Sequence, residues 1–172
     1  MPIKNYPIGD GFLTAQIQDE TGKFNLNDLA STAGGDIEQK KKILRAKRLF
    51  ELLRVSPTLV DALIDWVDQD EVPQPAGAES LYYQSLRPPY RSANNPLPGL
   101  GDLRLIKGFT PEIIERISPY VTVFPQEGGV PMNLNTADPI VLQTLDPSVT
   151  QTMAIEIVQG RPYKTKVDLD RV

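Results

Sequence analysis

Five carboxylate side chains are concentrated in one short part of the 172-residue sequence, where they could bind a metal ion. Four fall within seven residues and the fifth follows two prolines and a glycine, in the order Asp65, Asp68, Asp70, Glu71 and Glu79. These carboxylates repel one another, and four of them crowd the end of a predicted helix, where exposed carbonyls carry about half a negative charge. A hard divalent cation among them would replace this repulsion with attraction. The chemistry that the segment suggests is therefore coordination of a cation by oxygen.

The spacing within this segment favours calcium over other metals. Asp68, Asp70 and Glu79 lie at offsets 1, 3 and 12, which are ligand positions of an EF-hand loop. Offset 5 is Val72 and offset 6, where an EF-hand has glycine, is Pro73, so the segment is not an EF-hand. Calcium accepts irregular coordination by about six to eight oxygens, whereas magnesium requires octahedral geometry and zinc favours nitrogen or sulfur. On spacing alone two interpretations remain open, a calcium loop and a solvated acidic turn between two helices.

Composition excludes several other kinds of site. The chain has no cysteine and no histidine, which rules out disulfides, thiolate chemistry and imidazole as a proton shuttle. Its formal net charge is −4, from 18 basic and 22 acidic residues, without the basic excess that nucleic-acid or anionic-membrane partners usually require. Paired carboxylates could serve as acid and base, but Ser80 and Ser85 have no base partner in the pattern. We therefore predict a protein that is not an enzyme.

The elements that would position the acidic segment are mostly short helices. An apolar stripe predicts a helix over residues 36–54; it consists of Ile43, Ala46, Phe50 and Leu53. Further helices are predicted where an oxygen-bearing N-cap residue precedes proline, at Ser56-Pro57, Thr110-Pro111, Asp138-Pro139 and Asp146-Pro147. Helices this short gain most of their stability by packing on one another. The proline-rich residues 84–102 predict a long ordered loop.

The N-terminal part has the alternating pattern of a β-hairpin. Over residues 11–27, apolar and polar residues alternate on both sides of the turn "DETGK", in which Gly22 would supply a positive φ. A two-stranded hairpin is marginal alone, so this one needs more sheet. The tripeptide "NLN" occurs at 25–27 and again at 133–135, and its asparagines are expected to hydrogen-bond local backbone in turns.

Four segments, in order, resemble the K-type minor pseudopilins of bacterial type II secretion (general secretion pathway protein K). They read "DETGKFNLN" at 19–27, "LIDWVDQDEVPQPAGAESLYY" at 63–83, "PPYRSANNPL" at 88–97 and "NLNTADPIVLQTL" at 133–145. The resemblance covers nearly all of the chain from about Gly11 onward. It implies an α+β fold in which a large all-α domain is inserted into a small antiparallel pilin-like sheet, only part of which is present here.

The resemblance also divides the chain into two parts. Residues 1–35 would form the pilin-like hairpin portion and residues 36–172 the inserted α-domain. Within the α-domain we expect the acidic loop, defined as residues 65–83, and two helix-hairpin-helix-like units at 105–121 and 133–169.

Calcium binding in the inserted domain is a further property that the resemblance implies. The ligands carried over from the matching segment are Asp68, Asp70 and Glu79. Asp65 and Glu71 are additional candidates, and the calcium would have a structural role.

The resemblance implies a part in assembly rather than catalysis. Such proteins form a complex with the I-type and J-type minor pseudopilins at the tip of the periplasmic pseudopilus, beside the other pseudopilins of the system. Relatives carry a cleavable leader and an apolar N-terminal helix that anchors them in the inner membrane. This sequence lacks both, and it stops at "VDLDRV" where relatives continue into further strands. We therefore expect it to lie at the periplasmic face of the inner membrane, as the periplasmic domain of a membrane-anchored protein.

The alternative is a helix-hairpin-helix nucleic-acid-binding module, because the C-terminal unit also resembles DNA receptors of the competence type. In those proteins a Gly-hydrophobic-Gly hairpin offers backbone N–H groups to a phosphate. Here the corresponding "DPSV" has no glycine, and Asp146 would repel the phosphate. The other unit retains Gly108, but Glu112 and Glu115 follow it. We therefore expect the helical architecture without a nucleic-acid partner.

Overall fold

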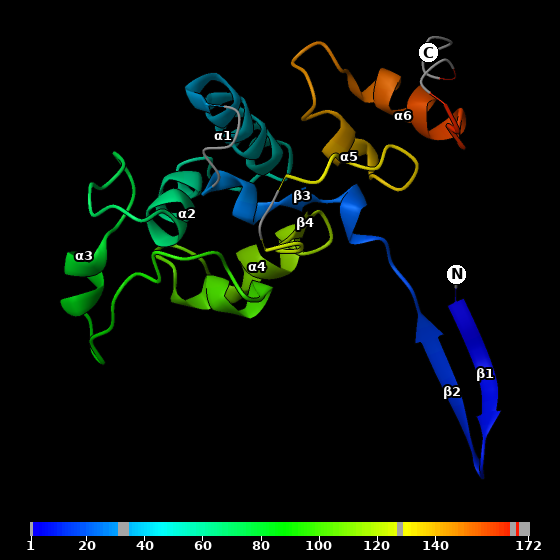
Figure 1. Cartoon of the computed structure of the whole chain (residues 1–172), viewed down its shortest axis with the longest axis horizontal. Helices are drawn as coiled ribbons and strands as arrows, with labels where there is room; N and C mark the ends of the chain where they lie inside the picture. The colour runs from blue at the N-terminus through cyan, green and yellow to red at the C-terminus, as the bar shows by residue number, and fades with distance from the viewer. Residues whose placement is uncertain (1, 31–34, 127–128, 166–167, 169–172) are drawn as a thin grey trace.

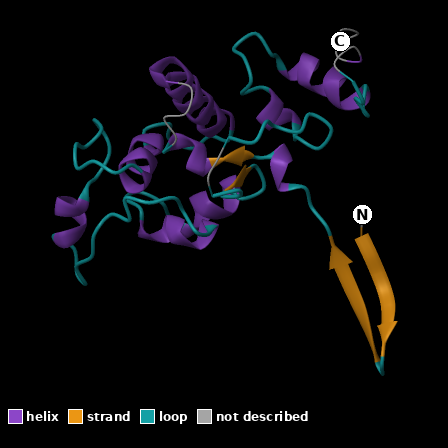
Figure 2. Cartoon of the chain, viewed as in Figure 1, coloured by secondary structure: helices purple, strands orange, loops and turns teal. Residues whose placement is uncertain are grey.

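The computed structural model describes residues 2–30, 35–126, 129–165 and 168. A β-hairpin at the N-terminus stands apart from a body of short helices, and the last two helices lie at one side of that body (Figure 1). Strands occur in two small sheets and the rest of the described regular structure is helical, as Figure 2 shows. The predicted mixture of a small antiparallel sheet and a larger helical part is confirmed.

The hairpin uses a different pair of strands from the predicted pair. β1 (Pro2–Ile8) pairs antiparallel with β2 (Gly11–Gln16), and Gly9 in the turn has a φ of +56°. The prediction of a hairpin over residues 11–27 is therefore wrong. The turn forms before β2 because Gly9 adopts the left-handed conformation at no steric cost. After β2 the chain is drawn toward the body, where Phe24 is only 3% exposed.

Residues 20–25 join the body instead of returning along β2. A 3-10 helix, η1 (Glu20–Gly22), leads into β3 (Phe24–Asn25), which pairs in parallel with β4 (Val121–Thr122). A Cβ on Gly22 would lie 2.7 Å from Thr136 Oγ1. Glycine is thus required here for a close approach of two segments, and not for the turn that the sequence suggested.

The helical body contains the helices predicted from periodicity and capping, and also short helices over residues 26–29, 80–84 and 100–105 that the sequence analysis did not predict. They are η2 (Leu26–Leu29), α1 (Gly35–Leu52), α2 (Leu59–Val67), α3 (Ser80–Gln84), η3 (Leu100–Leu105), α4 (Pro111–Ile117), α5 (Pro139–Leu142) and α6 (Gln151–Gln159). The predicted N-caps Thr110 and Asp138 are confirmed, because their side chains accept hydrogen bonds from the second or third backbone N–H of α4 and α5.

Two predicted helix starts are displaced. α2 begins at Leu59, after a turn in which Leu59 N–H donates to Ser56 O. α6 begins at Gln151, with Thr150 as its N-cap, so the prediction of a start at Asp146-Pro147 is wrong. The Asp146 carboxylate instead accepts hydrogen bonds from the backbone and hydroxyl of Ser148, which closes a separate turn before the helix.

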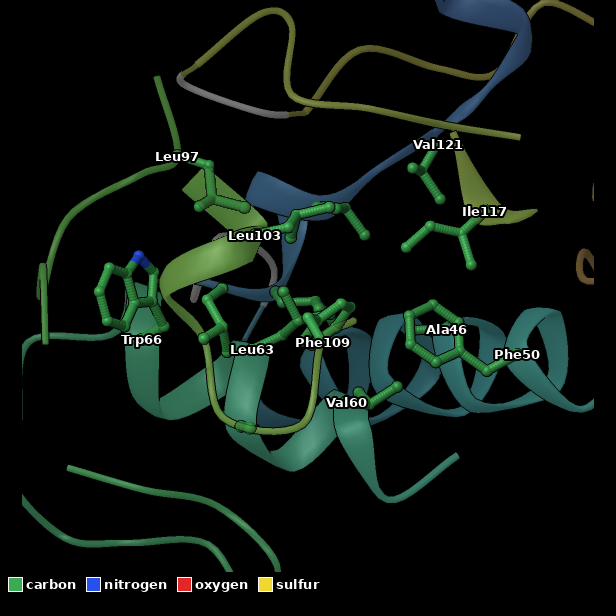
Figure 3. Packing of buried hydrophobic residues seen from close by; sticks show 14 of the residues in the cluster. Ala46, Phe50, Val60, Leu63, Trp66, Leu97, Leu103, Phe109, Ile117 and Val121 are labelled. Atoms are coloured by element: carbon green, nitrogen blue, oxygen red, sulfur yellow. The ribbon is translucent and has the colours of Figure 1, made fainter. Parts of the chain in front are cut away.

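One hydrophobic core joins the helices around β3 and β4 (Figure 3). Phe50 of α1 meets Phe109 edge to face, with ring centroids 6.3 Å apart. A smaller cluster of Ala137, Leu142 and Ala154 packs α5 against α6, the helix pair of the predicted unit at 133–169. Leu26 and Leu29 are buried in the main core together with the helices. The division of the chain at residue 35 stays a prediction.

The two NLN sequences each combine a local hydrogen bond with a distant one. Asn25 and Asn133 accept from the backbone two residues later, which confirms the predicted local turns. The third residue of each tripeptide reaches further, which the sequence did not indicate. The Asn135 amide exchanges two hydrogen bonds with the backbone of Tyr163, at 2.9 and 2.7 Å.

Asn27 is the buried counterpart of Asn135, at 2% exposure. Its Nδ2 donates to Leu97 O at 3.0 Å and to Val123 O at 2.9 Å, and its Oδ1 accepts from Leu97 N at 2.7 Å. One amide therefore satisfies backbone groups from two segments that lie 70 and 96 residues further along the chain.

Replacing Asn27 by alanine should destabilise the chain by about 3 kcal/mol or more, because each buried backbone group left without a partner costs about 1–3 kcal/mol. Urea unfolding followed by circular dichroism measures the loss. Asn95→Ala is the matched control, since Asn95 is exposed and donates only to Ala93 O, and a change within about 0.5 kcal/mol is expected. Equal losses in the two variants would contradict the role given to Asn27.

Candidate metal centre

The acidic loop begins inside the last turn of α2 and ends at the start of α3. Asp65 lies on α2 and is fully buried, at 0% exposure. Asp68 is the C-cap, where its N–H donates to Ile64 O and the chain turns into an extended conformation. Glu79 occupies the N-cap position of α3 and is only 5% exposed. The loop between them folds back so that its two ends meet.

This return brings three carboxylates together. Asp65, Asp68 and Glu79 each place one oxygen within 4.8 Å of the other two, and we call them the three-carboxylate site. The ion pairs found among the described residues involve none of the three. Asp68 Oδ1 and Glu79 Oε1 are buried and have no hydrogen-bond partner in the described part of the chain. Buried acceptors without partners are costly, so these two oxygens call for a positively charged group.

The pKa values of the three carboxylates are all raised above their ordinary values. Burial, followed by the charges of Asp70 and Asp65, raises the pKa of Asp68 to about 6. Burial, followed by the charges of Asp65 and Asp68, raises the pKa of Glu79 to about 7. Burial also raises the pKa of Asp65, against the lowering effect of a backbone hydrogen bond from Gln74. All three shifts come first from burial, and the repulsion between neighbouring carboxylates adds to them.

The backbone of the loop is shaped around Asp65. Gln74 N–H donates to both oxygens of this carboxylate, at 3.0 and 3.2 Å. A Cβ on Gly77 would lie 1.8 Å from Asp65 Oδ2, so only glycine fits at this point. Asp61, one turn earlier on α2, accepts from Ala76 N at 3.3 Å and pairs with Lys47 at 2.9 Å. The loop is thus held against α2 by carboxylates that its own backbone contacts.

The remaining two acidic residues lie outside the three-carboxylate site. Asp70 is exposed, and its Oδ1 accepts from Val72 N at 2.8 Å. Glu71 accepts from the backbone and the hydroxyl of Ser80 at 3.2 and 2.9 Å. These bonds pin the loop to α3. Whether either residue also contacts an ion stays a prediction.

Asn94 is a neighbour of the site that the sequence analysis did not single out. Its Nδ2 donates to Asp70 O at 3.4 Å and to Glu71 Oε1 at 3.3 Å, and its N–H donates to Trp66 O. Its Oδ1 is buried and has no partner among the described residues. The segment "PPYRSANNPL", quoted above for its resemblance, contains this residue, but only the folded chain shows that it meets the acidic loop.

The donor set fits a hard cation. Every partnerless buried atom at the site is an oxygen acceptor, on Asp68, Glu79 and Asn94. Calcium takes oxygen ligands in irregular geometry and tolerates carboxylates from separate turns of the chain. If calcium binds here, Asp65, Asp68 and Glu79 are the residues that would hold it.

The comparisons with known proteins agree on one family. A family model described as "Type II secretion system (T2SS), protein K" matches residues 22–126. Type II secretion system protein K of Aeromonas hydrophila is 34% identical over 145 residues, which is 78% of this chain and 44% of that protein. The corresponding protein of Klebsiella pneumoniae is 35% identical over 143 residues, with coverages of 79% and 43%. The chain spans less than half the length of these curated relatives.

A solved structure has the same fold. It is a chain of the GspK-GspI-GspJ complex from the type 2 secretion system of enterotoxigenic Escherichia coli, with a TM-score of 0.74 and 20% identity over 99% of this chain and 66% of that chain. In the described part of the sequence, no helix is both long enough and apolar enough to cross a bilayer. The matched proteins are components of the type II secretion system. Within this class of components the chain belongs to the protein K family, which confirms the resemblance inferred from the four motifs.

The pKa shifts predict an unusual pH dependence for the metal-free chain. Asp68 and Glu79 have pKa values of about 6 and about 7 when folded, against ordinary values of about 4. Between about pH 4 and pH 7, the folded chain therefore binds more protons than the unfolded chain. The free energy of unfolding then increases as the pH falls. In the presence of chelator, the melting temperature should therefore be higher at about pH 5 than at about pH 8.

Thermal melts in chelator at a series of pH values test this, with the double variant Asp68→Asn, Glu79→Gln as control. The double variant should lose most of the dependence. Asp19 does not interfere, because hydrogen bonds from Thr21 and Thr136 hold its pKa at about 2, and it stays ionised over this range. A wild-type melting temperature that increases with pH would contradict the arrangement described here.

Proposed function

We propose that this chain is a non-catalytic, structural part of a minor pseudopilin, located at the periplasmic face of the inner membrane. Membership of the protein K family supports the assignment. The fold shared with a chain of the GspK-GspI-GspJ complex supports I-type and J-type minor pseudopilins as its partners. In this role the chain contributes shape and contact surface to the tip of the pseudopilus, and no step of its function requires bond making.

We further propose that calcium binds at the three-carboxylate site and fixes the acidic loop. The observation that carries this proposal is the Glu79 carboxylate, which is 95% buried, has an unpartnered Oε1 and places one oxygen within 4.8 Å of carboxylate oxygens of Asp65 and Asp68. Bound calcium would supply the missing positive charge. Because it would bind the folded chain only, it would increase stability by about 2.7 kcal/mol at a hundredfold excess over Kd.

Calcium should therefore raise the melting temperature of the chain, and chelator should lower it. Asp68→Asn and Glu79→Gln should each abolish most of the calcium-dependent shift, because each removes a ligand charge while keeping a similar shape. Differential scanning calorimetry with calcium or chelator measures the effect. An identical transition of the wild-type chain in both conditions would refute the calcium site.

Asp70→Asn separates two possible ligand sets in the same experiment. Asp70 is exposed and its carboxylate accepts from Val72 N–H, so this variant should keep most of the calcium-dependent shift. A loss as large as that of Glu79→Gln would show that the EF-hand-like spacing, and not the folded arrangement, identifies the ligands. Glu51→Gln, an exposed position on α1, controls for the change in net charge.

Assembly with partners is tested separately from metal binding. The full-length protein, co-expressed with the I-type and J-type minor pseudopilins of the same organism, should co-purify with both through size-exclusion chromatography. A major pseudopilin from an unrelated system, co-expressed under the same conditions, is the control for non-specific association. Elution of the protein separately from both partners would contradict the proposed place in the tip complex.

A further inference from the structure

Lys107 contacts the acidic loop from a distant part of the chain. Its Nζ donates to Gly77 O at 2.9 Å and to Ala76 O at 3.3 Å, across about thirty residues of sequence. The same ammonium group lies 5.2 Å from the ring centroid of Tyr82. None of the ion pairs found among the described residues involves Lys107. This lysine therefore directs its charge at backbone carbonyls of the loop.

The turn that carries Lys107 is itself fixed at two points. Lys107 N–H donates to the Tyr83 hydroxyl of α3 at 3.2 Å. Gly108 has a φ of +84°, and a Cβ at this position would lie 2.5 Å from Leu59 Cδ2 at the start of α2. The turn is thus packed against α2 and bonded to α3, the two helices that the acidic loop connects. A lysine on such a support can hold the loop at a defined place.

The segment 74–77 is therefore held by two separate parts of the chain. Gln74 N–H bonds to the Asp65 carboxylate, and Gly77 lies in contact with it. The Lys107 ammonium bonds to the carbonyls of residues 76 and 77. Only one residue, Ala78, separates this segment from Glu79, whose carboxylate completes the three-carboxylate site. The position of Glu79 relative to Asp65 thus depends on where the carbonyl groups of 76 and 77 are held.

We propose that Lys107 is a positioning residue of the metal site, which holds the loop backbone so that Glu79 meets Asp65 and Asp68, without being a ligand. This inference rests on the proposed calcium site and adds to it a residue that lies outside the acidic loop. In this proposal the "IKGF" turn at 106–109 holds the backbone of the acidic loop in place through Lys107.

Two effects of Lys107 on cation affinity have opposite signs, and this makes the inference testable. A positive charge near a cation site repels the cation, so removing the charge alone would strengthen binding. Removing a residue that positions the ligands weakens metal binding, by about 10- to 100-fold for comparable outer contacts. If the positioning role dominates, Lys107→Met binds calcium about 10-fold or more weakly than the wild-type chain.

Terbium luminescence provides the measurement. The chain has a single tryptophan, Trp66, which directly follows Asp65, so terbium bound at the site should be sensitised by excitation of the indole. Titration with terbium, followed by displacement with calcium, gives both affinities for the complete 172-residue chain. Arg104→Met is the matched control, because Arg104 is exposed and lies three residues before Lys107. It removes the same charge from the same region without removing a contact to the loop.

The expected pattern is weaker calcium binding by Lys107→Met, recovery to within about threefold of wild type by Lys107→Arg, and unchanged or slightly tighter binding by Arg104→Met. The arginine variant should recover binding because its guanidinium can also donate to two carbonyls. Circular dichroism shows whether Lys107→Met folds. If it does not, Lys107→Gln shows in its place whether loss of the lysine weakens or strengthens calcium binding.

The outcomes separate this inference from the calcium proposal. Tight binding by the wild-type chain together with equal or tighter binding by Lys107→Met overturns the role of Lys107 and leaves the calcium site standing. Equal weakening by Lys107→Met and Arg104→Met also overturns it, because the loss would then not depend on the contacts of Lys107 with the loop carbonyls. Absence of terbium and calcium binding in the wild-type chain overturns the calcium site and the positioning role together.

Discussion

The burial of ionisable oxygens without a counter-charge is the constraint on which the rest of this structure depends. Asp65 and Glu79 are almost completely inaccessible to water, and Asp65 lies in the last turn of α2, where the helix dipole already disfavours anions. Backbone N–H groups provide part of the compensation, at Asp65, Asp70 and Glu71. They do not reach Asp68 Oδ1 or Glu79 Oε1. A cation would supply the missing positive charge, and without one the raised pKa values favour the neutral, protonated carboxyl.

The acidic loop is joined to the core by aromatic packing. Trp66 meets Tyr83 edge to face at 5.1 Å, and Tyr83 stacks on Tyr90 at 5.2 Å. α2, α3 and the long loop after α3 therefore share one set of contacts beside the acidic residues. Asn27 ties the same long loop, at Leu97, to the segment after β4. A change in the charge state of the site would therefore act on buried contacts that several distant segments share.

The sequence predicted the helices and the acidic loop better than it predicted pairings. Thr110 and Asp138 were recognised because capping and proline are local signals, and the stripe in α1 is a local periodicity. Asp146 has the same local signal, but its carboxylate closes a turn with Ser148 and the helix starts later. The hairpin was misplaced because alternation marks a strand without naming its partner, and burial of Phe24 draws that segment into the core. At the site, offsets along the chain favoured Asp70 over Asp65. Asp65 lies three positions before Asp68 at the end of α2, a helical spacing that brings the two side chains together and that the EF-hand template does not include.

The likeness to helix-hairpin-helix modules has a physical explanation that does not require nucleic acid. In a phosphate-binding hairpin, backbone N–H groups of the turn must remain free for the ligand. Here the turn at 106–109 retains Gly108 with its left-handed φ, but the neighbouring Lys107 N–H is bonded to Tyr83 and the glycine is packed against Leu59. The lysine that could have met a phosphate donates to two carbonyls of the acidic loop instead. The turn at 106–109 thus contacts the acidic loop of the same chain. A helical hairpin that packs well between two other helices is useful wherever a loop must be held, and its glycine is then explained by close packing with α2 and not by the approach of a phosphate.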